Sequence, residues 1–223
     1  MIGVDARLRL AVDPSLAWYD DVFALHGIAV ARSDRLWRAL DDPPAYHSAV
    51  KTIVPGVGAD RVLEATEPFA SCSVADSFGD VCPSGFALLF EAVWLHLDGG
   101  FSAGLPAGWS VVSSPAALAG WSDRHDYAGV LPATLDHPRF TVLARSDGDD
   151  LIGGAIVHDG AAAVGLSNTW SAEGHEPDWD ALLAAARAVH PGRPLTDYAR
   201  GDDLTGMLRL GFQPVGPQRV WVR

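Results

Sequence analysis

From Trp109 to the end of the chain, segments typical of strands and helices follow an order that few folds accommodate. Short β-branched or apolar runs predict strands, whereas apolar residues at every third or fourth position predict helices. An Asp/Gly turn from Asp147 to Asp150 joins two of the strands into a hairpin. The predicted strands are 109–112, 140–145, 151–157, 163–170, 195–199 and 215–222, and the predicted helices are 115–124, 178–189 and 202–210. This β-α-β-β-β-α-β-α-β order predicts a mixed sheet in an α/β or α+β fold.

The N-terminal half predicts further elements of both kinds. A helix capped by Ser15 runs to the neighbourhood of Gly27, and a short helix over 33–40 ends before two prolines. Strands are predicted over 49–55, 70–78 and 86–97, with a helix over 59–67. The run 86–97 is apolar on both faces, so we expect it at the centre of the sheet. The Gly- and Pro-rich stretch 98–108 then separates an N-terminal half, 1–104, from a C-terminal domain, 105–223.

A faint internal repeat relates the two halves. In each half a strand, a helix and a second strand are followed by a Gly-Phe pair and by a strand that contains a tryptophan. The pairs are Gly85-Phe86, before Trp94, and Gly211-Phe212, before Trp221. We therefore expect the N-terminal half to be a partial copy of the C-terminal one, with the same topology.

Charge and composition narrow the classes of partner. The chain has 28 acidic against 16 basic residues, a net charge of −12, which repels nucleic-acid phosphates and anionic lipid. No apolar run is long enough to span a membrane, and the start MIGVDARLRL is not a signal peptide, so we expect a cytoplasmic protein. Cys72 and Cys82 fit no metal-binding spacing, and they either meet across a hairpin or remain reduced thiols.

Several catalytic motifs are absent from the sequence. There is no GxSxG, HExxH or P-loop pattern, and the eight histidines are scattered along the chain. The sequence therefore predicts no metal site.

The C-terminal half resembles the GCN5-related N-acetyltransferases (GNAT). The resemblance covers roughly residues 107–223 and depends on the element order and on the ending GMLRLGFQPVGPQRVWVR, in which Gly211 and Phe212 follow a short helix. It implies a GNAT-like mixed central β-sheet flanked by helices, preceded by a partial GNAT-like half.

The resemblance also implies acetyl-CoA as cofactor, bound where the fourth strand, 163–170, separates from the fifth. The residues that would bind it are Leu166, Asn168, Trp170, Ser171 and Gly174. The loop 171–177 departs from the family pattern, because it has one glycine, no arginine, and a proline that removes an amide donor. Glu173 and Glu176 lie where the diphosphate would bind, and Asp178 can cap the next helix itself. We therefore expect acetyl-CoA to bind weakly or undetectably.

Glu91, Asn168 and Tyr198 are the candidate catalytic residues. Glu91 has apolar neighbours on both faces of its strand, so we expect it to be buried, as a general base or as the partner of an arginine. Asn168 is the polar side chain of the fourth strand that can face a substrate. The resemblance places the family's general acid, a tyrosine, at Met207, which cannot donate a proton, and Tyr198 is the candidate replacement.

Two functions remain open at this point. The first is an N-acetyltransferase that moves an acetyl group from acetyl-CoA to a small amine. The second is a GNAT-fold protein that binds a small ligand or a protein partner without acetyl-CoA. The sequence also leaves open whether the chain forms a homodimer.

Overall fold

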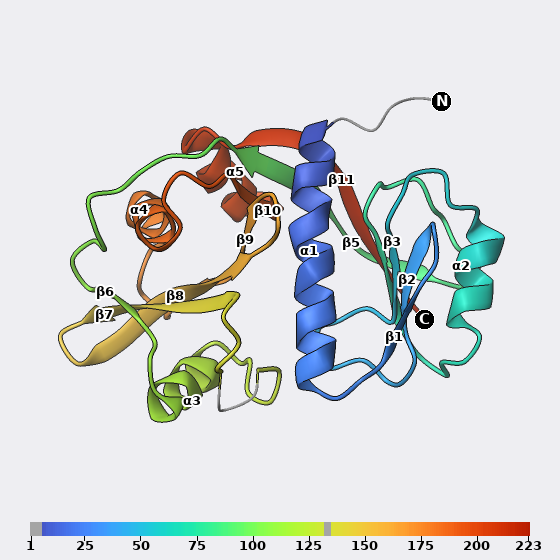
Figure 1. Ribbon diagram of the computed structural model, residues 1–223, viewed down its shortest axis with the longest axis horizontal. Helices are drawn as coiled ribbons and strands as arrows, with labels where there is room; N and C mark the ends of the chain where they lie inside the picture. The colour runs from blue at the N-terminus through green and yellow to red at the C-terminus, as the bar shows by residue number, and fades with distance from the viewer. Residues whose placement is uncertain (1–5, 132–134) are drawn as a thin grey trace.

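The computed structural model describes residues 6–131 and 135–223 (Figure 1). Residues 1–5 of the predicted N-terminal half lie outside the described residues. The helices are α1 (Ala6–Leu25), α2 (Ala59–Thr66), α3 (Pro115–Arg124), α4 (Trp179–Val189) and α5 (Gly201–Arg209). The strands are β1 (Val30–Arg32), β2 (Leu36–Ala39), β3 (Val50–Thr52), β4 (Ser73–Asp76), β5 (Ala87–Leu97), β6 (Trp109–Val111), β7 (Phe140–Asp147), β8 (Asp150–Asp159), β9 (Val164–Ser171), β10 (Leu195–Ala199) and β11 (Gln213–Val222). The order from β6 to β11 is the predicted one.

All these strands form one mixed sheet in the order β1-β2-β3-β4-β11-β5-β10-β9-β8-β7-β6. The strands β1, β2 and β3 pair antiparallel, and β3 then pairs parallel with β4 across the helix α2. From the other end, β7, β8 and β9 pair antiparallel, and β9 pairs parallel with β10 across α4. The two halves thus have the same pairing order, and the origin of the N-terminal half as a partial copy stays a prediction.

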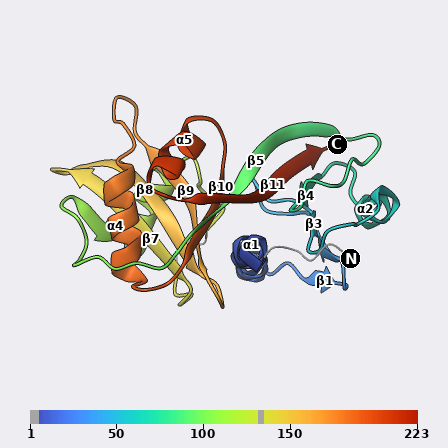
Figure 2. The ribbon, with the colours of Figure 1, turned by 90° about the horizontal axis from the view of Figure 1, so that it is seen from above.

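The last strands of the two halves lie at the centre of the sheet and are exchanged. Strand β5 pairs with β10 of the C-terminal half, and β11 pairs with β4 of the N-terminal half. The two strands also pair with each other along most of their length, as Figure 2 shows. Because each half pairs with a strand of the other, the hydrogen bonds of the sheet connect the residues before and after 104/105. The domain boundary predicted at 104/105 stays a prediction.

Helix α1 crosses the central strands between the two halves (Figure 1). It begins at Ala6, well before the predicted start, so Ser15 lies inside the helix and does not cap it. Pro14 also lies inside the helix, where it removes one backbone hydrogen bond. The prediction was wrong here because packing against β5, β9, β10 and β11 outweighs the local signals for a helix start.

Two helical layers cover opposite faces of the C-terminal part of the sheet. Side chains of successive β8 residues pack alternately against one layer and then the other, because neighbouring side chains of a strand point to opposite faces of the sheet. Ala155 and Val157 pack in the cluster that contains α4 and the Met207 end of α5, whereas Ile156 packs with α1 and α3. Figure 2 shows α1 and α5 on opposite sides of β10 and β11.

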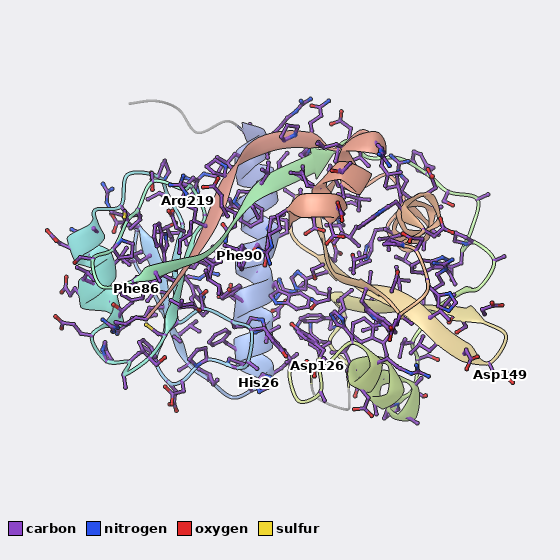
Figure 3. All side chains as sticks on the ribbon, turned by 180° about the vertical axis from the view of Figure 1, so that it is seen from behind. His26, Phe86, Phe90, Asp126, Asp149 and Arg219 are labelled. Carbon is purple, nitrogen blue, oxygen red and sulfur yellow. The ribbon has the colours of Figure 1, made fainter. Side chains whose placement is uncertain are left out.

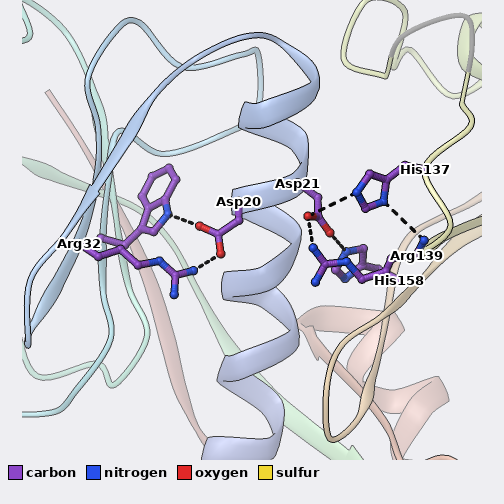
Figure 4. A network of polar contacts seen from close by, with 7 residues as sticks. Asp20, Asp21, Arg32, His137, Arg139 and His158 are labelled. Carbon is purple, nitrogen blue, oxygen red and sulfur yellow. Dashed lines mark hydrogen bonds and ion pairs between the residues drawn. The ribbon is translucent and has the colours of Figure 1, made fainter.

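A buried carboxylate connects α1 to the C-terminal half through hydrogen bonds and ion pairs (Figure 4). Asp21 is 5% exposed, and its Oδ2 lies 2.7 Å from His158 Nε2 on β8. Arg139 also pairs with Asp21, and His137 Nε2 lies 3.6 Å from it. On the other side of the helix, Asp20 accepts a hydrogen bond from the indole of Trp37 on β2. Adjacent aspartates therefore hold the two halves to one helix.

The helix predicted over 33–40 is wrong. This segment contains β2, in which Trp37 and Ala39 are buried while Leu36 and Arg38 are partly exposed. Trp37 packs edge-on against Phe23 of α1, with ring centroids 4.7 Å apart. The two-residue alternation of burial suits a strand beneath α1, and tertiary contacts outweigh the local helical pattern.

Strand β5 is central, as predicted, but its first half is solvent-exposed. Leu88 and Leu89 are 48% and 57% exposed, and Glu91 is exposed as well. Glu91 Oε2 accepts a hydrogen bond of 2.6 Å from Arg219 Nε on β11, the strand on which Figure 3 labels Arg219. The expectation of a buried Glu91 is therefore wrong, because the residues that the structure describes leave this end of the strand exposed, whereas its predicted pairing with an arginine is confirmed.

Replacing Glu91 should have little effect on stability. An exposed ion pair contributes about 0–1 kcal/mol, so we expect Glu91→Gln to lower the free energy of unfolding by less than about 1 kcal/mol. Urea unfolding of the variant and the parent measures the difference. A loss near 3 kcal/mol, typical of a broken buried pair, would contradict the exposed position.

Cys72 is buried and Cys82 exposed, and both are free thiols. The pairing across a hairpin therefore does not form. Among residues 6–131 and 135–223, no helix has the length and apolar character that crossing a bilayer requires.

Candidate functional site

A pocket of about 540 Å³ opens where β9 and β10 separate. The two strands pair only at Val164/Leu195 and Gly165/Thr196, although β9 continues to Ser171. Beyond these pairs their facing backbone edges are open to the pocket. The pocket has walls from α1 on one face of the sheet and from α4 and α5 on the other, so it passes through the sheet.

A β-bulge bends β9 at the pocket. Asn168 and Thr169 lie between the Ser167/Ile156 and Trp170/Gly154 pairs, opposite the single residue Ala155 of β8. Asn168 has a φ of 53°, a conformation that few residues other than glycine adopt. Bulges leave backbone groups unpaired and redirect side chains, and they are common beside active sites.

Three non-glycine residues have a positive φ in the described chain, and all three line the pocket. They are Tyr46 (65°), Asp126 (54°) and Asn168 (53°). The Tyr46 hydroxyl donates to the backbone oxygen of Asp126 at 3.2 Å, and His125 Nε2 lies 3.3 Å from Asn168 Oδ1. Figure 3 places Asp126 near His26, at the end of α1. Strained conformations cluster at binding and catalytic sites, where the surrounding structure enforces them.

The pocket is acidic and aromatic. Its carboxylates are Asp126, Asp197 and Asp203, and no lysine or arginine is among the described residues that line it. Its aromatic rings belong to Trp18, Tyr19, Tyr46, Trp94, Tyr127, Trp179 and Tyr198. Carboxylates and the faces of aromatic rings both attract cations, and apolar ring surface also attracts an organic body. These walls therefore suit a small organic cation.

Asp197 and Tyr198 bring titratable groups to the pocket from the end of β10. Burial raises the pKa of Asp197 well above its ordinary value, although its carboxylate accepts a 2.6 Å hydrogen bond from the Tyr198 amide. Burial likewise raises the pKa of Tyr198, so its phenol remains protonated. The Tyr198 ring lies edge-on to Trp94, with centroids 5.2 Å apart. Asp197 can accept a proton more readily than an ordinary carboxylate, and Tyr198 can donate a hydrogen bond.

The predicted site residues divide into two groups. Leu166, Asn168 and Tyr198 line the pocket. Trp170 and Ser171 border a much smaller space beyond Trp179, and Gly174 is exposed in the following loop. Glu91 lies outside the pocket. Sequence reasoning missed Ser15, Trp18, Tyr46, His125, Asp126 and Tyr127, because no local pattern signals a positive φ or a contact between distant segments.

The start of α4 does not fit a diphosphate. Asp178 Oδ1 accepts the Ala181 amide at 3.1 Å, which is the predicted cap, and so occupies one of the free donors at this helix end. Arg145, the nearby cation, donates to the Glu176 carbonyl at 3.1 Å and lies 3.9 Å from Asp178. Glu173 and Glu176 are exposed around the same helix end. An incoming diphosphate would meet carboxylates there.

Trp179 closes the space between α4 and α5 beside this helix end. Its indole lies directly on Gly206 of α5, since a Cβ placed on Gly206 would be 2.4 Å from Trp179 Nε1. Met207 lines the same wall and has no proton to donate. The open strand edges suit an extended thioester arm, but the residues around Asp178 and Trp179 do not fit acetyl-CoA.

Comparison with known structures shows a GNAT-like fold. A GCN5-related N-acetyltransferase from Kribbella flavida is similar over 96% of each chain, with a TM-score of 0.63 and 13% identity. A putative GNAT-family acetyltransferase from Novosphingobium aromaticivorans is similar over 98% of each chain, with a TM-score of 0.64 and 13% identity. A tandem GNAT protein of the clavulanic acid biosynthesis pathway has a TM-score of 0.53 and 16% identity, over 100% of this chain and 90% of its own. No family model and no curated protein matches the chain.

Proposed function

We propose that this protein binds a small organic amine in the pocket between β9 and β10. The observation that carries the proposal is the lining, which combines Asp126, Asp197 and Asp203 with aromatic rings and has no lysine or arginine among its described residues. The volume of about 540 Å³ is that of a small-molecule site.

The energy of such an interaction is sufficient for selective binding. A cation 4 Å from a carboxylate near a protein surface gains about 4 kcal/mol before its desolvation cost is subtracted. A cation over an aromatic face adds about 0.5–2 kcal/mol. A neutral molecule of the same shape gains neither contribution.

N-acetylation of the bound amine is the second candidate function. The GNAT-like fold, the open edges of β9 and β10, and the titratable pair Asp197 and Tyr198 support it. In this role Asp197 accepts the proton of the substrate ammonium, and Asn168 and Tyr198 orient the substrate. The capped start of α4 and the Trp179–Gly206 contact count against tight binding of acetyl-CoA.

Removing a pocket carboxylate should weaken amine binding. We expect Asp197→Asn and Asp126→Asn each to lower the affinity for a primary arylalkylamine by at least about tenfold, which is about 1.4 kcal/mol. Affinity in the parent should fall as the pH is lowered, because the raised pKa of Asp197 lets it take up a proton and lose its charge. Calorimetric titration at several pH values measures both effects.

Asp149→Asn is the matched control, because Asp149 is exposed in the turn between β7 and β8, away from Asp126 (Figure 3). Equal affinities in all four proteins would contradict the amine site.

Mass spectrometry of an amine incubated with the protein and acetyl-CoA tests the second candidate function. An acetylated product that forms only when the protein is present would establish N-acetylation. If no such product forms although the amine still binds, the function is binding without acetylation.

A further inference from the structure

Lys51, the only lysine of the chain, is buried directly behind the pocket. It lies on β3, is 1% exposed, and forms no ion pair with any carboxylate of the described residues. Its ammonium lies 5.0 Å from the centroid of the Tyr19 ring and 5.4 Å from that of Trp94. Its hydrogen-bond partner is the Ser15 hydroxyl, with Nζ and Oγ 3.1 Å apart.

Ser15 connects this lysine to the pocket. Ser15, Tyr19 and Trp94 all line the pocket, whereas Lys51 does not, so Lys51 reaches the pocket only through these three side chains. The arrangement is a hydroxyl that faces a cavity with an amine hydrogen-bonded to it from behind. A nucleophile within hydrogen-bonding distance of a base is the geometry that activates serine hydroxyls in enzymes.

The surroundings of Lys51 favour its neutral form. Burial lowers its pKa to about 7, and the opposing attraction of Asp76 on β4 only partly offsets this. The other titratable groups nearby are His47, which precedes β3, and Tyr19 of α1, and burial keeps both in their neutral forms. A lysine whose amine is free near neutral pH has a lone pair that accepts a proton.

We propose that Ser15 and Lys51 are a nucleophile and its general base, which take an acyl group from an activated ester or thioester. Ser15 Oγ bonds to the carbonyl carbon while its proton passes to Lys51 Nζ. The bond from that carbon to the leaving oxygen or sulfur then breaks, and the leaving group takes the proton from Nζ. The result is an acyl ester on Ser15 and a free alcohol or thiol.

A second step completes the transfer. The ammonium of the bound amine first gives one proton to Asp197, and its nitrogen then attacks the ester carbon. Lys51 takes a second proton from this nitrogen and passes it to the departing Ser15 Oγ, so the products are an amide and the free Ser15 hydroxyl. This step rests on the proposed function, because its acceptor is the amine of the pocket. The first step does not, since it needs only the serine, the lysine and an acyl donor. The route requires no diphosphate site at α4.

A fluorophosphonate probe tests the first step in the full-length parent protein. The probe bonds to activated serines, and peptide mapping by mass spectrometry identifies the labelled residue. We expect labelling at Ser15 on the order of a hundredfold faster than at Ser102, a loop serine whose hydroxyl donates to the Gly104 carbonyl. The rate should rise with pH through the region of about 7, as Lys51 loses its proton.

Substitutions distinguish activation of Ser15 by Lys51 from simple access of the probe to Ser15. Ser15→Ala should abolish labelling at this site, Ser102→Ala should not change it, and Lys51→Arg, which retains a charge but cannot act as a base, should slow it to the level of Ser102. Ser167, which also lines the pocket, should remain unlabelled in the parent. Absence of labelling at Ser15 in the folded parent, or equal labelling of Ser15 and Ser167, would overturn the proposal.

The outcome is independent of the amine site. Calorimetry with an amine on Ser15→Ala reports ligand binding without the nucleophile, so a failure of the proposed function and a failure of this pair are distinguishable. Because the probe acts on the parent, the relative labelling of Ser15 and Ser167 decides the proposal even if Lys51→Arg folds poorly.

Discussion

Asp21→Ala should lower the free energy of unfolding by about 2–3 kcal/mol, because it removes the buried carboxylate with which His158 and Arg139 form hydrogen bonds. Asp21 is 5% exposed and is contacted by His158, Arg139 and His137 (Figure 4). Without the carboxylate, the Arg139 charge and the His158 ring lose their shared acceptor between α1 and the C-terminal half. Chemical unfolding followed by tryptophan fluorescence measures the loss.

The same substitution at an exposed position of α1 provides the control. Asp13 is exposed on the same helix, so Asp13→Ala should change stability by less than about 0.5 kcal/mol. If both variants lost the same small amount, the buried network would not hold α1 to the C-terminal half.

Acidification should destabilise the protein through His47. Its Nε2 accepts a hydrogen bond of 2.9 Å from the Trp18 indole, and its Nδ1 lies 2.9 Å from the Ala45 carbonyl, so the buried ring is neutral. Burial lowers the pKa of His47 from 6.5 to about 4. Below pH 6.5 the unfolded chain therefore binds a proton that the folded chain does not bind. The free energy of unfolding consequently decreases as the pH falls from 6.5 towards 4. Lowering the pKa by this amount corresponds to about 3 kcal/mol.

His47→Gln isolates this contribution, because glutamine does not titrate. Asp76 and Asp197 have raised pKa values and change stability in the opposite direction, but they are the same in both proteins. Unfolding free energies of parent and variant, measured at intervals from pH 7 to pH 4, should converge by about 3 kcal/mol. Parallel curves would show that His47 titrates as it does in the unfolded chain.

The C-terminal half could be predicted well because its signals are local. The Asp147–Asp150 turn fixes the β7–β8 hairpin, and the Asp178 cap fixes the start of α4. The N-terminal half was predicted less well because long-range packing decides its elements. Trp37 belongs to a strand beneath α1, and that helix runs through Pro14 because both halves pack against it.

The site was only partly predictable for the same reason. Asn168 and Tyr198 lie on or at the end of strands that the sequence predicts, and both line the pocket. Tyr46 and Asp126 come from loops 80 positions apart and have backbone conformations that their residue types do not signal. The burial predicted for Glu91 was wrong because a strand that is apolar on both faces is buried only where other layers cover it.

The most direct test of the amine site is a calorimetric comparison of three compounds with similar skeletons and different charges. Phenethylamine, phenethyl alcohol and hydrocinnamic acid present a cation, a neutral hydroxyl and an anion to the same pocket of the parent protein. The acidic, aromatic lining predicts that the amine binds at least about tenfold more tightly than the alcohol, and that the acid binds most weakly. Equal affinities for amine and alcohol, or tightest binding of the acid, would contradict the account.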